Sequence, residues 1–171
     1  MRAEHALHVV CGPPAAGKST HARALARQLG GVLLELDTAS EPIVEAALTA
    51  LGRDPRDRDS PFYKETFREP IYEALFALAA ENLPHASVVL VGPFTRELRN
   101  PGWPAALEAR FGTSVTIHFV TCALEERRRR MEVRGEPRDE LKLADWDDHR
   151  RYYAGAEAPA FPSHIVDTTR D

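Results

Sequence analysis

The chain has 171 residues and a formal net charge of −4, with 43% apolar and 28% charged side chains. This length suits one domain with a substantial core, and no apolar run approaches the ~20 residues that cross a bilayer. The acidic balance argues against extensive wrapping of nucleic acid. The N-terminal residues lack a signal-peptide pattern, and the two cysteines have neither metal nor redox spacing. We therefore expect a cytoplasmic protein without a membrane anchor, in which both thiols stay reduced.

Short β-rich runs alternate with helical patterns along the whole chain. The runs predict strands at residues 6–11, 32–37, 87–92, 114–120 and 164–167. The patterns between them predict helices at residues 18–29, 41–51, 61–68, 70–83, 124–133 and 140–154. Ser40 is the expected N-cap of the second helix, Ser60 caps the third, and Pro70 separates the third from the fourth. This alternation predicts a parallel sheet covered by helices.

A glycine-rich loop joins the first predicted strand to the first predicted helix. Its residues Gly12, Gly17, Lys18 and Ser19 complete the pattern G-x-x-x-x-G-K-[ST]. Glycines let successive N–H groups of such a loop point inward, and the following helix N-terminus favours anions. The lysine reaches the β- and γ-phosphates of a nucleotide, and the serine hydroxyl can ligate Mg²⁺. The expected nucleotide-binding residues are therefore Gly12, Pro13, Pro14, Ala15, Ala16, Gly17, Lys18, Ser19 and Thr20.

With this loop, the chain resembles the P-loop kinases, specifically the small-molecule phosphotransferase branch that includes chloramphenicol phosphotransferase, gluconate kinase and zeta-toxin-like proteins. The resemblance implies an α/β fold of three layers, α/β/α, around a five-stranded parallel sheet in the order 2-3-1-4-5. It implies one kinase domain over residues 1–171, with a short helical lid at about 124–140 and acceptor-site helices at about 40–83. It also implies ATP and Mg²⁺ as cofactors.

Asp37 ends the second predicted strand, where open parallel sheets bind their ligands. A carboxylate there can orient an attacking hydroxyl and accept its proton. Several members of the resembled family carry an aspartate at the matching position, which implies a catalytic base and acceptor contact at Asp37. The alternative is a helix-capping or solvated aspartate. Glu35 is expected to be solvated or to support the site from behind.

An arginine-rich segment, LEERRRRMEVRGEPRD, covers residues 124–139. Planar guanidinium groups suit phosphate oxygens and the charge that develops in phosphoryl transfer. The segment resembles the arginine-bearing lid of P-loop kinases, which implies a nucleotide contact for Arg130 and catalytic contacts for Arg134 and Arg138. The alternative is a solvated helix in which Glu125 and Glu126 pair with arginines three or four residues further on.

The third predicted strand ends without a carboxylate, because Val91 and Gly92 stand where many P-loop proteins carry a magnesium-binding aspartate. Magnesium would then depend on Ser19, Asp37, the phosphates and water. Motors and switches use the missing aspartate, so its absence argues against both.

Residues after the third strand are candidates for the acceptor pocket. Phe94 and Arg96 can line it, with Arg68 from the preceding helices as a further candidate. In related kinases a turn after the last strand lies near the adenine, which makes Thr168 a candidate nucleotide contact. The seven histidines form no metal-binding spacing.

The leading hypothesis is an ATP- and Mg²⁺-dependent kinase that transfers the γ-phosphoryl group to a hydroxyl of a small molecule. We expect a monomer or homodimer with no nucleic-acid or membrane partner. One alternative is a polynucleotide 5′-hydroxyl kinase, which would need an arginine shortly after Asp37. Another is a nucleotide-binding regulatory module with little turnover. The identity of the acceptor and the choice between ATP and GTP stay open.

Overall fold

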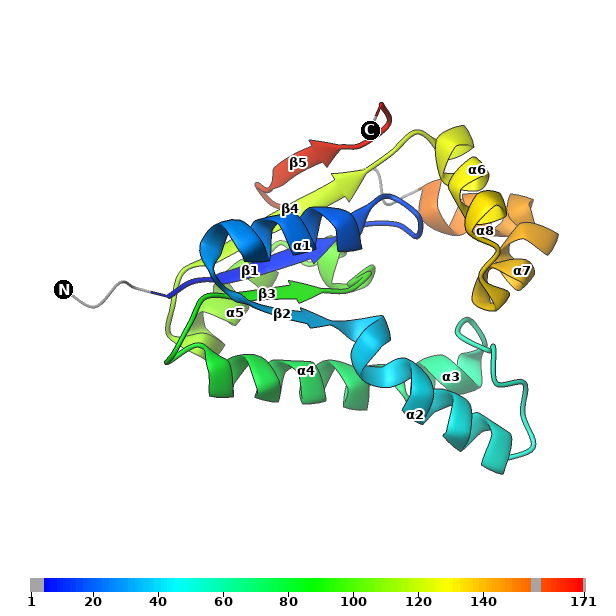
Figure 1. Ribbon diagram of the computed structural model, residues 1–171, viewed down its shortest axis with the longest axis horizontal. Coiled ribbons are helices and arrows are strands. Elements are labelled where there is room, and N and C mark those ends of the chain that lie inside the picture. The colour runs from blue at the N-terminus through cyan, green and yellow to red at the C-terminus, as the bar shows by residue number, and fades with distance from the viewer. Residues whose placement is uncertain (1–4, 155–157, 171) are drawn as a thin grey trace.

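The computed structural model describes residues 5–154 and 158–170, apart from the side chains of residues 138, 141 and 152–154. Its five parallel strands form one sheet in the order β2-β3-β1-β4-β5 (Figure 1). This order, with β1 at the centre, confirms what the resemblance implied. The strands are β1 (Leu7–Cys11), β2 (Val32–Glu35), β3 (Val88–Val91), β4 (Val115–Thr121) and β5 (His164–Asp167).

Helices cover both faces of the sheet and extend beyond its carboxyl edge (Figure 1). They are α1 (Lys18–Leu29), α2 (Leu36–Ala50), α3 (Pro61–Thr66), α4 (Arg68–Asn82), the 3₁₀ helix η1 (Glu97–Arg99), α5 (Trp103–Phe111), α6 (Leu124–Arg134), α7 (Pro137–Ala144) and α8 (Trp146–Ala154). None of the helices in the described residues is long and apolar enough to span a bilayer.

Alternate residues of the central strands enter two separate cores. Val9 of β1 and Leu90 of β3 pack on the face that α4 and α5 cover. Val10 and Val89, their neighbours in sequence, pack on the opposite face against α1. The two-residue period of a strand explains this division, and burial on both faces explains why β1 and β3 read as continuous apolar runs. The central strands are thus held firmly, and their carboxyl ends form a fixed base for the site.

The start of α2 corrects the predicted boundary between the second strand and its helix. The prediction extended the strand to Asp37 and began the helix after Ser40, whereas β2 ends at Glu35 and α2 begins at Leu36. Asp37 therefore lies in the first turn of α2, where the helix dipole favours a carboxylate. Ser40 is not an N-cap, because its hydroxyl donates to the carbonyl of Leu36 at 2.8 Å within the helix.

Two further segments, at residues 103–111 and 137–154, differ from the predicted helices. The helix α5 was not predicted; it begins after Gly102 and ends where Gly112 takes a left-handed φ of 63°. The single helix predicted at 140–154 is two helices, α7 and α8. Asp145 lies between them, and its carboxylate accepts a hydrogen bond from the backbone N–H of Asp148 at 3.2 Å, as an N-cap does.

Candidate active site

The glycine-rich loop between β1 and α1 is tightly fitted to the sheet. Gly12 has a φ of 135°, and a Cβ added there would lie 2.1 Å from the carbonyl oxygen of Val120 in β4. Gly17, just before α1, has a φ of 92°. Only glycine combines these conformations with so close a backbone approach. The loop is therefore shaped by its glycines to present its backbone at the N-terminus of α1, where anions bind.

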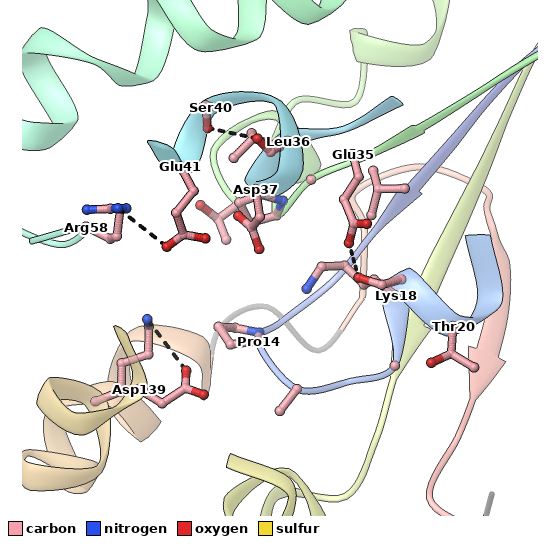
Figure 2. A pocket seen from close by; sticks show the side chains of 18 of the residues that line it. Pro14, Lys18, Thr20, Glu35, Leu36, Asp37, Ser40, Glu41, Arg58 and Asp139 are labelled. Carbon is pink, nitrogen blue, oxygen red and sulfur yellow. Dashed lines mark hydrogen bonds and ion pairs between the residues drawn. The ribbon is translucent and has the colours of Figure 1, made fainter. Parts of the chain in front are cut away.

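Lys18 is the first residue of α1 and points back over the loop. Its Nζ donates to the carbonyl oxygen of Pro13 at 2.8 Å. Burial lowers the pKa of Lys18 to about 8, and the negative charge of Asp37 offsets part of this effect. The attraction between Lys18 and Asp37 is effective because the two side chains are near each other, as Figure 2 shows.

A cavity of about 800 Å³ joins the glycine-rich loop to helices α2, α3 and α4. Asp37 and Lys18 lie close together within it (Figure 2). The predicted site residues that line the cavity are Pro14, Ala15, Gly17, Lys18, Ser19, Thr20, Asp37, Arg68, Arg130, Arg134 and Thr168. Other predicted site residues do not line it, namely Gly12, Pro13, Ala16, Phe94 and Arg96.

Glu35 contacts the serine of the loop, a role that the sequence did not reveal. The hydroxyl of Ser19 donates a short hydrogen bond to the carboxylate of Glu35, and Arg23 pairs with the same carboxylate at 3.3 Å. Glu35 lies beside Val91 in the pairing of β2 with β3. The carboxylate that β3 lacks at its own end is therefore supplied by the neighbouring strand.

Arg130 of α6 is engaged with the end of β5. Its Nη1 donates to the hydroxyl of Thr168 at 2.9 Å, and that hydroxyl donates to the carbonyl of Ala16 at 2.7 Å. Glu126 accepts a further hydrogen bond from Arg130 at 2.9 Å, as the solvated-helix alternative expected. Thr168 itself is buried. Arg130 and Thr168 thus link α6, the end of β5 and the glycine-rich loop.

The two arginines expected to act in catalysis flank the turn between α6 and α7. Arg134 lines the cavity, and its guanidinium forms two hydrogen bonds with the buried carboxylate of Asp139, at 2.5 and 2.9 Å. Arg138 lies in α7, but its side chain is outside the described part of the structure. The catalytic role of both arginines stays a prediction.

Arg127, which the sequence did not single out, is the buried arginine of α6. Its Nε donates to the carbonyl of Pro14 in the glycine-rich loop at 3.0 Å. Its Nη2 lies 3.3 Å from Nε2 of His149 in α8, whose pKa is lowered to about 4 by burial and by Arg127. A neutral His149 is able to accept this bond. Arg127 therefore ties the glycine-rich loop to α6.

Phe94 and Arg96, the two residues predicted to line an acceptor pocket, do not line the cavity. Phe94 is fully buried with a φ of 45°, and its ring stacks on Tyr72 with centroids 4.8 Å apart. Arg96 is exposed to solvent. Thr95, between them, lines the cavity instead. The expected acceptor-site segment at about 40–83 also lines the cavity, through residues that the sequence did not single out, namely Glu41, Arg58, Asp59, Tyr63 and Lys64.

Comparison with known proteins gives the same fold. A protein from Chloroflexus aurantiacus described as a proposed kinase is 20% identical, with 98% of this chain and 90% of that chain covered and a TM-score of 0.65. A gluconokinase from Sinorhizobium meliloti is 17% identical, with 100% and 86% covered and a TM-score of 0.56. Kti12 from Chaetomium thermophilum, solved in complex with ADP-AlF3, is 20% identical, with 96% and 90% covered and a TM-score of 0.58. At these identities the likeness is one of fold.

Sequence comparison identifies the family. None of the curated proteins matches the chain. A family model described as an AAA domain matches residues 7–156, which include the glycine-rich loop, Asp37 and the helices α6 and α7. The phosphate loop between β1 and α1, the sheet order and this match agree with one another, and the chain belongs to the AAA domain family, with the fold of a small P-loop kinase.

Proposed function

We propose that the protein is an ATP- and Mg²⁺-dependent kinase that transfers the γ-phosphoryl group to a hydroxyl of a small molecule. The observation that carries the proposal is the cavity of about 800 Å³, which the phosphate loop and the helices α2 to α4 line together and in which Asp37, in the first turn of α2, lies near Lys18. Its volume is typical of sites for small ligands. A nucleotide site alone does not explain why residues of α2, α3 and α4 line the same cavity as the phosphate loop.

The residues of the cavity suit phosphoryl transfer by alignment and charge stabilisation. Lys18 would balance the charge of the transferred group, and Asp37 would orient the acceptor hydroxyl and take its proton as the new O–P bond forms. Arg134 of the lid would stabilise charge on the phosphate oxygens. Closure of the lid would exclude water and protect the nucleotide from hydrolysis.

The donor set fits a magnesium ion. Ser19 offers a hydroxyl, Glu35 and Asp37 offer carboxylates, and Mg²⁺ prefers such hard oxygen ligands. Within the described residues there is no group of three or more histidine, cysteine, aspartate or glutamate side chains placed to hold a metal by themselves. This suits Mg²⁺, which keeps waters and phosphate oxygens in its shell. When bound, the ion would neutralise phosphate charge.

A regulatory module that binds a nucleotide with little turnover is the second candidate. The buried, apolar end of β3 at Val91 and Gly92 favours it, because no carboxylate stands there. Glu35 weakens this argument, since its carboxylate reaches Ser19 from the next strand. The kinase proposal therefore explains more of the residues that line the cavity than the regulatory module does.

ADP release measured with pooled hydroxyl compounds tests the proposal. We expect an acceptor-stimulated rate that Asp37→Asn lowers by about 100-fold or more while ATP affinity stays nearly unchanged. Glu45→Gln, an exposed change on the same helix, serves as the control and should keep the rate. Full turnover by Asp37→Asn would remove Asp37 as the base, and tight ATP binding with no stimulation by any pool would favour the regulatory module.

A further inference from the structure

The acceptor side of the cavity carries as many negative as positive charges. Six charged side chains from α2, α3, α4 and the loop between α2 and α3 line it. The three cations are Arg58, Lys64 and Arg68, and the three carboxylates are Asp37, Glu41 and Asp59. A pocket that recognises an acid usually presents a cationic group to it. The charges of this pocket are matched before any acceptor arrives.

Arg58 is already bound to a carboxylate in the cavity. Its Nη2 lies 3.4 Å from Oε1 of Glu41, and the two side chains are only 15% and 27% exposed (Figure 2). Its Nη1 donates to the carbonyl oxygens of Pro55 and Asp57, at 2.8 and 2.7 Å. The guanidinium therefore has its charge compensated and much of its donor capacity used by the protein itself.

Arg68 is compensated in the same way from behind the cavity wall. Its Nη2 donates to Oε2 of Glu97 in η1 at 2.9 Å, with the side chains 13% and 20% exposed. Glu97 does not line the cavity, so it neutralises Arg68 without reaching the acceptor. The guanidinium also lies 5.4 Å from the centre of the Tyr72 ring. Both arginines of the acceptor side thus hold internal carboxylate partners.

These pairs would disfavour an acid and suit hydroxyl groups. A carboxylate or phosphate brought to Arg58 would meet Glu41, and like charges in a half-buried site repel each other with little screening. A hydroxyl both donates and accepts, so neighbouring hydroxyls can donate to Glu41 and accept from Arg58. The rings of Tyr63 and Tyr72 and the side chain of Ile71 offer a surface for an uncharged carbon skeleton.

We propose, resting on the kinase function proposed above, that the acceptor is an uncharged polyhydroxylated molecule whose hydroxyls bridge Glu41 and Arg58. Sugar acids, phosphorylated compounds and nucleic-acid ends are excluded by the internal carboxylates. Glu41 and Glu97 act as specificity residues, because Glu41 holds Arg58 within the cavity and Glu97 neutralises Arg68 from outside it, so that neither guanidinium offers an uncompensated charge to an anionic substrate group.

Removing the carboxylate partner of Arg58 or of Arg68 should create a binding site for an anion. The probe is acetate, titrated into the full chain loaded with a non-hydrolysable ATP analogue, and binding is followed through the arginine side-chain N–H signals by NMR. Glu41→Gln and Glu97→Gln should each bind acetate at least about tenfold more tightly than the unmodified protein, through Arg58 and Arg68 respectively. The matched control Glu45→Gln, exposed on α2, should behave as the unmodified protein. Acetate binding by the unmodified protein as tight as in the variants, or no gain in either variant, overturns the proposal.

A second measurement separates this proposal from the kinase function. Acceptors are pooled by charge into uncharged polyols and nucleosides, sugar acids with 5′-hydroxyl oligonucleotides, and amino sugars. Stimulation of ADP release by the uncharged pool alone supports the proposal, and a preference for either charged pool overturns it. If no pool stimulates ADP release, the kinase function fails, and the acetate titration still decides whether the pocket rejects anions.

Discussion

At the scale of single residues, Lys18 links the chemistry of the phosphate loop to pH. Burial holds its pKa at about 8, because the charged form loses hydration that Asp37 replaces only in part. Near pH 8 such an amine is present in both protonation states. Nucleotide phosphates placed beside it favour the charged form and raise its pKa again. Nucleotide binding should therefore be coupled to proton uptake.

We expect binding of ATP with Mg²⁺ at pH 8 to take up about half a proton at Lys18. Isothermal titration calorimetry in buffers of different ionisation enthalpy measures this number. Lys18→Arg carries a charge that does not titrate in this range, so it should lose the uptake even where it binds less tightly. Equal uptake by the two proteins would contradict the assignment to Lys18.

Residues could be predicted from the sequence where their role follows from local spacing. Lys18 and Ser19 follow Gly17 directly, and the loop that positions them is a local structure. The contact of Glu35 with Ser19 depends instead on how β2 lies in the sheet, which spacing does not encode. Phe94 turns into the core through a left-handed φ that few residues other than glycine adopt. Its burial could therefore not be predicted from the sequence pattern.

At the scale of elements, all five strands lie within two residues of their predicted bounds, and α1 matches its prediction. Buried parallel strands and a capped amphipathic helix have strong local signals. The helix α5 was missed because Pro101, Gly102 and Pro104 at its start read as breakers, although proline is tolerated in the first turn. The start of α2 was missed because β2 enters it with no intervening loop.

The helix α6 acts on the phosphate loop through one side chain. Arg127 is 5% exposed and donates to the carbonyl of Pro14 from across the cavity wall. A half-buried carbonyl that loses a charged donor is left poorly hydrogen-bonded, which is costly. Because Pro14 belongs to the loop that binds phosphates, this contact should affect nucleotide affinity as well as stability.

We expect Arg127→Met to raise the dissociation constant for ATP by about tenfold, the equivalent of one lost charged hydrogen bond. Fluorescence titration with a labelled nucleotide measures the constant, and circular dichroism confirms that the variant is folded. The matched control is Arg128→Met, one residue further along α6, whose exposed side chain pairs with Glu132. Equal affinity in the two variants would mean that Arg127 does not position the loop.

At the scale of the whole molecule, the order of the strands is the feature that periodicity could not supply. An apolar run predicts that a strand is buried on both faces, but it does not say which strands are its neighbours. The order was available only from the resemblance that the glycine-rich loop carries, and the structure confirms it. The same resemblance does not predict which residues line the acceptor side of the cavity, because the relatives share the fold but differ in sequence.

A row of four histidines connects segments that are far apart in the sequence and adjacent in the fold. His118 of β4 lies within hydrogen-bonding distance of His8 in β1, at 3.2 Å, and of His21 in α1, at 3.3 Å. The ring of His164 in β5 stacks on His118 with centroids 5.5 Å apart. Burial, followed by the charges of the other three histidines, lowers the pKa of His118 from 6.5 to about 4. The folded chain therefore resists protonation at a point where three strands and a helix meet.

Unfolding restores the ordinary pKa of His118, so the unfolded chain binds more protons than the folded one between pH 6.5 and about 4. Stability from this group is complete above pH 6.5 and falls as the pH drops through that window, by at most about 1.4 kcal/mol per pH unit before solvent screening reduces it. Urea unfolding at pH values from 7 to 5.5, above the range of most carboxylates, should show this slope. His118→Gln should reduce the slope, with His149, whose pKa is also lowered to about 4, supplying part of what remains, whereas His85→Gln, a change at an exposed histidine, should leave the slope intact. A slope unchanged by His118→Gln would show that protonation of this row of histidines does not limit stability in mild acid.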